Sequence, residues 1–303
     1  MQTPISRRQV LGRMLAASAA TALAPSLLKT SRAADAPGYK IGCFTRPWKD
    51  DPYPVAFDAI AEAGFKYVGF MTTKLPGSYI ITSRTSIEDA AKAGEEAKKR
   101  GLGVLAAWGG GLPVQNGPAD GITALRKLID NAAAATVGTL LMGGTTNAVQ
   151  YDAYYKAIEE CCDYATEKNV ALVIKPHGGL NSTGEQCRKT IEKVAKKNFR
   201  LWYDPGNIYF YSAGALDPVN DAKSVNGIVT GMCVKDFKQP LNVDVTPGDG
   251  KVKFEAVMAE LRTGGFTSGP LVIETLGPID DPKQKIAEAK KARMLVEKLA
   301  ANG

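Results

Sequence analysis

A lysine and a histidine stand two residues apart at the end of an apolar run, at Lys175 and His177. The run Val170–Ile174 is typical of a strand buried on both faces of a parallel sheet, and the proline and glycines of 176–179 end it. We therefore expect both side chains at the carboxyl end of a strand, as candidate catalytic groups. The alternative is that His177, the only histidine of the sequence, hydrogen-bonds within a loop while Lys175 reaches solvent.

Two carboxylates occupy comparable positions further along the chain. Asp204 ends the apolar run 199–203, and Glu274 ends the apolar run 270–273. Two carboxylates that point into one cavity suit a divalent cation with oxygen ligands, or general acid–base catalysis. The alternative is that they form ion pairs with Lys175 or Lys235, because buried charges need partners.

Four further residues are candidates for contact with a substrate. The rings of Trp48 and Trp108 are expected to stack on the apolar C–H face of a sugar, although aromatic residues of a barrel are often core residues. Asn207 and Lys235 are expected to hydrogen-bond to the same ligand. The glycine-rich segment 109–111 lacks the pattern of a phosphate-binding loop, so a nucleotide is not expected.

These residues must be positioned by an alternation of short apolar runs and amphipathic helical segments. Eight strand-then-helix units between residues 39 and 300 predict an α/β fold, a (β/α)₈ TIM barrel in a single domain, in which the carboxyl ends of all strands meet at one mouth. A doubly wound open sheet is the rival, but its glycine-rich loop is missing after the first strand. The expected strands cover residues 39–45, 65–71, 102–108, 137–142, 170–175, 199–204, 228–235 and 270–274.

The first 36 residues have the composition of a targeting segment. A twin-arginine pair in Ser6–Gly12 precedes an apolar, alanine-rich stretch, and the small residues of Ala33–Ala36 suit cleavage. We expect a twin-arginine signal peptide over residues 1–36, a barrel domain over 37–303, and a periplasmic or otherwise exported protein without stable membrane insertion. An uncleaved membrane anchor is the alternative.

The charge and the cysteine content argue against a nucleic-acid-binding protein and against a disulfide-stabilised one. The chain has a net charge of +7, of which residues 1–36 carry +4, so only +3 belongs to the expected domain. No basic stripe interleaved with aromatic residues remains, so nucleic acid is not an expected partner. The five cysteines have no framework spacing, and we expect buried free thiols.

Residues 39–300 resemble the xylose isomerase-like TIM barrels, a family of sugar isomerases and epimerases that includes endonuclease IV. Tyr203–Asn207 is similar to the family's Asp-x-Gly-Asn strand end, and Val234–Asp236 to its His-x-Lys-Asp strand end. Pro247–Phe254 is similar to the glycine-rich loop before its seventh helix, and Val272–Thr275 to its closing metal-binding strand. The resemblance implies a barrel that acts on a small-molecule carbohydrate with one divalent metal ion.

The sequence departs from the metal pattern of that family. The resemblance implies Glu, Asp, His and Glu ligands from strands five to eight, and this chain matches at Asp204 and Glu274 only. Lys175 stands at the place of the first glutamate and Cys233 at that of the histidine. His177 would supply a replacement nitrogen in a His177, Asp204 and Glu274 site for Mn, Mg, Co or Zn, with Cys233 as a less suitable fourth ligand. Alternatively, the ammonium of Lys175 takes the place of the cation.

We therefore expect an exported isomerase or epimerase that moves a proton next to the carbonyl of a sugar or keto-sugar, through an enediolate-type intermediate. Glu274 is the candidate base or ligand, with Lys175 and His177 as electrophilic or acid partners. The alternatives are a barrel that binds carbohydrate without turnover, and a lyase or hydratase that acts on an oxidised sugar. A phosphoesterase like endonuclease IV needs many histidines, and this sequence has one.

Overall fold

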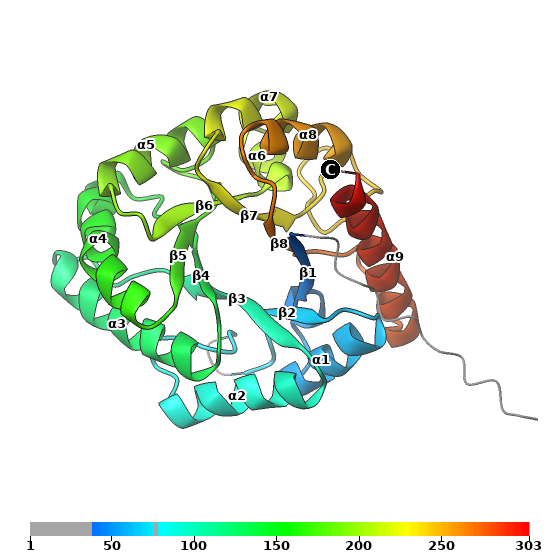
Figure 1. Cartoon of the computed structure of the whole chain (residues 1–303), viewed down its shortest axis with the longest axis horizontal. Coiled ribbons are helices and arrows are strands. Elements are labelled where there is room, and N and C mark those ends of the chain that lie inside the picture. The colour runs from blue at the N-terminus through cyan, green and yellow to red at the C-terminus, as the bar shows by residue number, and fades with distance from the viewer. Residues whose placement is uncertain (1–37, 76–77, 303) are drawn as a thin grey trace, which may run out of the picture. The chain divides into compact units, whose positions relative to one another are not determined.

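The computed structural model describes residues 38–75 and 78–302, which form a closed barrel of eight parallel strands (Figure 1). Neighbours in sequence are neighbours in the barrel, and β8 pairs back onto β1. The expected signal peptide, residues 1–36, lies outside the described residues. The strands are β1 (Tyr39–Phe44), β2 (Tyr67–Phe70), β3 (Gly103–Gly110), β4 (Thr139–Met142), β5 (Ala171–Ile174), β6 (Phe199–Tyr203), β7 (Val229–Val234) and β8 (Gly269–Ile273).

Helices surround the strands as an outer ring (Figure 1). The expected (β/α)₈ barrel is confirmed, with every expected strand present. Within residues 38–75 and 78–302, no helix is both long and apolar enough to span a membrane. The helices are α1 (Tyr53–Glu62), α2 (Ile87–Lys99), α3 (Pro118–Ala134), α4 (Tyr151–Glu167), α5 (Gly184–Val194), α6 (Pro205–Tyr211), α7 (Pro218–Ala222), α8 (Phe254–Thr263) and α9 (Pro282–Ala301), with short 3-10 turns at η1 (Arg46–Trp48), η2 (Ala148–Gln150) and η3 (Lys223–Val225).

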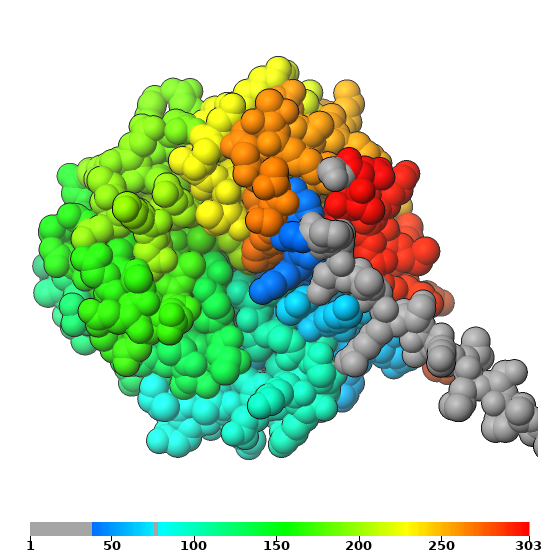
Figure 2. Space-filling model, viewed as in Figure 1, coloured from blue at the N-terminus to red at the C-terminus, as the bar shows by residue number. Residues whose placement is uncertain are grey.

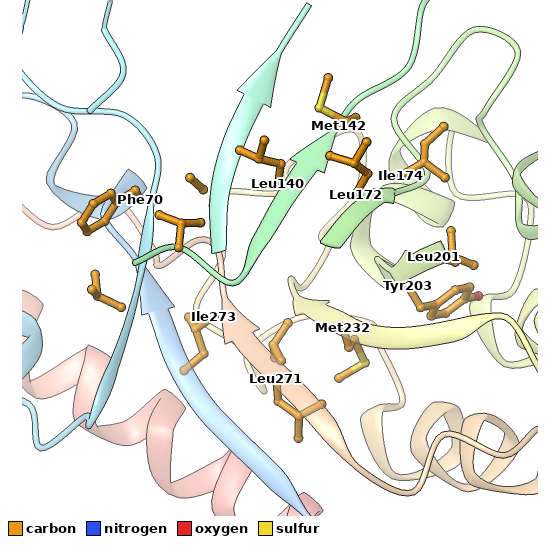
Figure 3. Packing of buried hydrophobic residues seen from close by; sticks show 14 of the residues in the cluster. Phe70, Leu140, Met142, Leu172, Ile174, Leu201, Tyr203, Met232, Leu271 and Ile273 are labelled. Atoms are coloured by element: carbon orange, nitrogen blue, oxygen red, sulfur yellow. The ribbon is translucent and has the colours of Figure 1, made fainter. Parts of the chain in front are cut away.

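Alternate residues of each strand face two different cores. On β5, Leu172 and Ile174 belong to the large apolar layer between strands and helices, whereas Val173 belongs to a second cluster inside the barrel. This follows from the two-residue period of a strand. Figure 3 shows part of the outer layer, with labelled side chains from β4 to β8 packed together.

Large side chains fill the barrel interior. The ring of Phe44 lies against Gly69, and the indole of Trp202 lies against Gly231, so two glycines leave the space that two bulky residues occupy. In the space-filling view, atoms occupy the middle of the ring that looks open as a ribbon (Figure 2). The interior is therefore a packed core, and any ligand must bind at the mouth.

The short helix α6 directly after β6 was not expected from the sequence. Asp204 caps it by accepting a hydrogen bond from the backbone N–H of Asn207 at 2.9 Å, and Pro205 stands at its first turn. An aspartate followed by a proline is a typical helix start, which is the signal that could have predicted this helix. It carries Asn207, Tyr209 and Tyr211 over the end of the strand.

The five cysteines, Cys43, Cys161, Cys162, Cys187 and Cys233, are free and buried, as expected.

Candidate functional site

Four ionisable residues continue the inward-facing series of four neighbouring strands. Each stands two positions after a residue of the barrel interior, just beyond the strand end, so each side chain enters the barrel above the packed core. The backbone ladder holds this layer in place, because Lys175 N–H donates to the carbonyl of Met142 and Glu274 N–H to that of Val234. The four residues and their inward neighbours are Lys175 after Val173, Asp204 after Trp202, Lys235 after Cys233, and Glu274 after Val272.

The two lysines and the two carboxylates form one buried ion cluster. Lys175 Nζ lies 3.0 Å from Asp204 Oδ2 and 2.5 Å from Glu274 Oε2. Lys235 Nζ lies 3.3 Å from Asp204 Oδ2 and 2.6 Å from Glu274 Oε1. No side chain of the four is more than 2% exposed. The alternative that the carboxylates pair with Lys175 or Lys235 is thus confirmed.

Arg46 joins the cluster from the turn after β1. Its guanidinium donates to Glu274 Oε1 at 3.0 Å and to Asp244 on its outer side at 3.2 Å. The sequence assigned Arg46 no role, although it stands two positions after the inward-facing Phe44. The Arg46 side chain is 31% exposed and that of Asp244 61% exposed, so the half-buried Arg46 adds a third cation to the two buried lysines and two buried carboxylates.

The hydrogen-bond donors of the two lysines are used unequally. An ammonium has three N–H donors. Those of Lys235 have three acceptors, Asp204, Glu274 and Asn207 Oδ1 at 3.1 Å. Lys175 has two carboxylate acceptors, and its Nζ lies 5.5 Å from the ring centre of Trp108. Of the two lysines, Lys175 is therefore the one with an N–H that can bind a further oxygen.

Asn207 acts inside the protein. Its side-chain amide donates to the carbonyl of Pro176 at 2.7 Å while its carbonyl oxygen accepts from Lys235, and it is 3% exposed. It links the end of β5 to α6 and to the ion cluster. Both residues that were expected to hydrogen-bond to a substrate, Asn207 and Lys235, are therefore placed to position the cluster.

His177 lies beside the cluster and contacts two aromatic rings. Its ring centre is 5.1 Å from that of Trp108 and 5.7 Å from that of Tyr211 of α6. Burial, together with the charges of Lys175 and Lys235, lowers the pKa of His177 to about 3. The imidazole is therefore neutral at physiological pH, able to hydrogen-bond but not to carry charge. Tyr211 could not be recognised from the sequence because α6 was not expected.

The two tryptophans differ in placement. Trp108 is half-buried at the end of β3, next to His177, and remains a candidate for sugar stacking. Trp48 is 3% exposed and belongs to the apolar layer between strands and helices. The structure does not bring Trp48 to the ion cluster; a tryptophan after a strand has the same sequence signal whether it faces the core or the mouth.

Protonation in the cluster follows from its charges. Burial by itself raises the pKa of Glu274, but Lys175, Lys235 and Arg46 hold it well below its ordinary value. Burial by itself lowers the pKa of Lys175, but Glu274 and Asp204 raise it above its ordinary value. In the resting site, Glu274 is therefore a carboxylate and Lys175 an ammonium group.

The donor set does not fit a divalent metal ion. Ligand atoms of Asp204, Glu274 and Cys233 lie within 4.8 Å of one another, and within the described part of the chain His177 is not in that group. The expected set of His177, Asp204 and Glu274 is thus not brought together. Cys233 is a buried thiol, and a soft sulfur ligand suits an oxygen-rich sugar site poorly. Two ammonium groups already contact the carboxylate oxygens.

Two pockets are lined by residues that contact the cluster. One, of about 220 Å³, is lined by Arg46 and by Thr275, whose buried hydroxyl has no hydrogen-bond partner in the described structure. The other, of about 650 Å³, is lined by Trp108, the glycines of 109–111 and Arg84. A small polar ligand would contact Arg46 in the first pocket and Trp108 in the second.

Comparison with known proteins agrees with this architecture. Residues 57–296 match the model of the family described as xylose isomerase-like TIM barrel. L-Ribulose-5-phosphate 3-epimerase UlaE of Salmonella paratyphi C (strain RKS4594) is 27% identical over 194 residues, which cover 58% of this chain and 64% of that protein. The match thus spans less than two thirds of the relative's length.

Solved structures share the fold at low identity. D-Allulose 3-epimerase from Methylomonas sp. in complex with D-allulose has a TM-score of 0.69 at 17% identity, over 86% of this chain and 97% of that chain. IOLI protein with a binding zinc atom has a TM-score of 0.67 at 17% identity, over 87% of this chain and 98% of that chain. With eight parallel strands, a strand-end cluster at the mouth and a family match over most of its length, the chain belongs to the xylose isomerase-like TIM barrel family.

Proposed function

We propose that this protein is a sugar isomerase that moves a proton between carbons next to the carbonyl of an aldose or keto-sugar. The observation that carries the proposal is Glu274, a buried ionised carboxylate that shares a mouth with the spare N–H of Lys175. A base and an electrophile side by side are what enolisation of a sugar requires. Relatives named as sugar 3-epimerases support a carbohydrate substrate.

The proton transfer uses two groups of the cluster. The carbonyl oxygen of the substrate accepts the spare N–H of Lys175, and Glu274 Oε2 takes the proton from the neighbouring carbon. The electrons of that C–H bond form the C=C bond of an enediolate, and the carbonyl electrons move to the oxygen next to Lys175. The hydroxyl proton on the deprotonated carbon passes to the oxygen next to Lys175, and the proton on Glu274 is transferred to the former carbonyl carbon, so that the carbonyl group moves to the neighbouring carbon. His177, as a neutral imidazole, is placed to donate a hydrogen bond to a second substrate oxygen.

The low pKa of Glu274 is compatible with its role as the base. Negative charge leaves the carboxylate as it appears on the enediolate, and both sites lie beside the same ammonium group. The total charge of cluster and substrate together is therefore constant during the step. The cations that hold the pKa of Glu274 down also stabilise the enediolate. A free carboxylate in water has no such compensation.

The cluster favours isomerisation over epimerisation. Inversion at one carbon needs a proton acceptor on one face and a donor on the other, and the family pattern has two glutamates for these roles. Lys175 replaces the first of them. We assign Asp204 to positioning instead, because its Oδ1 caps α6 by accepting from Asn207 N–H, and protonation of Asp204 would weaken that cap. Glu274 alone can return a proton to the same face of either carbon, which gives an aldose–ketose pair.

The test is a panel of aldoses and ketoses, with and without a terminal phosphate, analysed by chromatography. Conversion of a ketose to an aldose is expected. Glu274→Gln should lower kcat by about 10²–10⁴-fold, the usual contribution of one positioned base. Glu185→Gln on the exposed face of α5 is the control, because its carboxylate pairs only with Lys189 on the surface. Full turnover by Glu274→Gln would refute the assignment.

A second candidate is a barrel that binds carbohydrate without turnover. The observation that favours it is the number of donors on Glu274, which accepts from Lys175, Lys235 and Arg46 in the resting state. A carboxylate fixed in this way is a poor base unless the substrate takes over some of those donors. Stoichiometric sugar binding by calorimetry without product formation would favour this candidate over the isomerase.

We further propose that the protein is exported by the twin-arginine route. The support is the twin-arginine pair of Ser6–Gly12, the apolar stretch after it and the small residues of Ala33–Ala36. In the native host, the full-length chain should appear in the periplasmic fraction with a new amino terminus near Ala36. An R7K/R8K variant should stay in the cytoplasm. Equal distribution of both chains would contradict this proposal.

A further inference from the structure

We infer that the ammonium groups of Lys175 and Lys235 are the resident cation of this site, so that the protein works without a divalent metal ion. The inference deepens the proposed function, because it names the electrophile of that same site. It rests on the positions of two side chains relative to two carboxylates and on the impossibility of moving them aside.

The ammonium groups occupy the space that a metal ion would need. A divalent ion bound by carboxylates lies about 2.0–2.6 Å from their oxygens, depending on the metal. Lys175 Nζ bridges Asp204 and Glu274 at 3.0 and 2.5 Å, and Lys235 Nζ bridges the same two residues at 3.3 and 2.6 Å. An ion between these carboxylates would contact two positive charges.

Neither lysine can move away from the carboxylates. Lys175 is fully buried, and its backbone N–H is held by the ladder bond to Met142. The ring centre of Trp108 lies 5.5 Å from its Nζ. Lys235 is 2% exposed and fixed by Asn207, which is itself bonded to the carbonyl of Pro176. A lysine that moved away from both carboxylates would become a buried charge without a partner.

The charge of the cluster suits an anionic intermediate. Arg46, Lys175 and Lys235 exceed the two buried carboxylates by one positive charge. An enediolate has one negative charge, which takes the place of the charge that Glu274 loses when it accepts the proton, so the total charge of cluster and substrate does not change. The spare N–H of Lys175 gives that charge a defined position, at the carbonyl oxygen of a neutral keto-sugar or aldose.

The experiment measures metal binding directly, independently of turnover. Chelator-treated wild-type protein is titrated calorimetrically with Mn²⁺, Co²⁺ and Zn²⁺, and its metal content after purification is measured by mass spectrometry. No stoichiometric site is expected. One tightly bound equivalent that is lost in D204N would overturn the inference.

A variant designed to gain metal binding tests whether Lys175 is the residue that excludes a metal ion. K175E/C233H restores the family's carboxylate and imidazole at the two departing positions, and it should bind one equivalent of Mn²⁺ or Co²⁺. K197E is the matched control, because it reverses the charge of an exposed lysine away from the mouth. If K175E/C233H has the circular dichroism of the wild type and binds no metal, Lys175 is not what excludes the ion. If it does not fold, the wild-type titration decides.

Different results would refute the proposed isomerase function and the inference that ammonium groups replace the metal ion. A wild-type protein that binds a metal at Asp204 and turns over a sugar retains the proposed function and loses this inference. A wild-type protein that binds no metal and turns over no sugar retains the inference about the cation and loses the isomerase.

Discussion

His177 and Lys175 stand two residues apart and have opposite electrostatic environments. Lys175 has two carboxylates as partners, so its charge is stabilised; His177 lies beside aromatic rings, and burial and the two lysines favour its neutral form. Residues 175–177 therefore place one charged and one neutral group at the same mouth at physiological pH. This difference decides which residue can stabilise an anion and which can only hydrogen-bond.

At the scale of single residues, the protonation of His177 gives a prediction. Its pKa is lowered to about 3, so the neutral imidazole stabilises the folded state above the ordinary histidine pKa of about 6.5, and this contribution is lost as the pH falls toward 3. The sequence has one histidine, so a tag-free protein gives one set of imidazole proton signals. Their chemical shifts should not change between about pH 8 and 5.

A titration of these signals with a midpoint near the ordinary value would contradict the buried, cation-flanked position of His177. His177→Gln is the companion variant. Its free energy of unfolding should depend less on pH than that of the wild type over the same interval, because the unfolded wild type alone binds a proton to an imidazole there.

At the scale of elements, the loop between β5 and α5 positions His177. The backbone N–H of His177 donates to the carbonyl of Asn181 at 2.8 Å, and α5 then begins with a capping box between Thr183 and Gln186. The hydroxyl of Thr183 accepts from Gln186 N–H, and the Gln186 side chain accepts from the backbone of Thr183. The start of α5 thus fixes the far end of the loop.

Thr183→Ala should lower the free energy of unfolding by about 1 kcal/mol, because it removes one half of that box. The change is measured by urea denaturation. Thr263→Ala is the control, since its exposed hydroxyl only donates to the carbonyl of Ala259 within α8. An equal loss in the two variants would show that the cap of α5 makes no special contribution.

Element by element, the sequence indicated the strands and most helices because their apolar period and terminal glycines are local signals. It did not indicate α6, whose start at Asp204 was interpreted only as a strand end, and so the capping role of Asp204 and the position of Tyr211 could not be anticipated. It also did not distinguish Trp48 from Trp108, because the side to which a residue after a strand points depends on the turn that follows.

At the scale of the whole molecule, the packed interior supports the mouth. The layer directly below the ion cluster is formed by buried apolar side chains. They are those of Val173, Trp202, Cys233 and Val272. Convergence of the four ionisable residues could be predicted from the barrel. Their pairing could not, because sequence distance does not say whether a lysine from β5 bridges two carboxylates or leaves space for a metal.

The close packing of the barrel interior can be tested by replacing a glycine with alanine. A methyl group at Gly231 would lie 2.5 Å from the indole of Trp202, so Gly231→Ala should lower the free energy of unfolding by about 1–3 kcal/mol through overpacking. Gly111→Ala is the control, because nothing lies within 4 Å of its added methyl group. The comparison is made by urea denaturation, and similar stabilities of the two variants would contradict the packed-interior account.

The central claim is that buried ammonium groups replace a metal ion in sugar enolisation. Its most direct measurement is deuterium incorporation from heavy water into a substrate sugar, followed by proton NMR, with chelator-treated protein. We predict that wild-type exchange persists in the presence of chelator and that Lys175→Met lowers its rate by about 10²–10³-fold, the usual loss for one donor to a developing oxyanion. Exchange that stops on chelation and returns with added Mn²⁺ or Co²⁺, or that is unchanged in Lys175→Met, would contradict the claim.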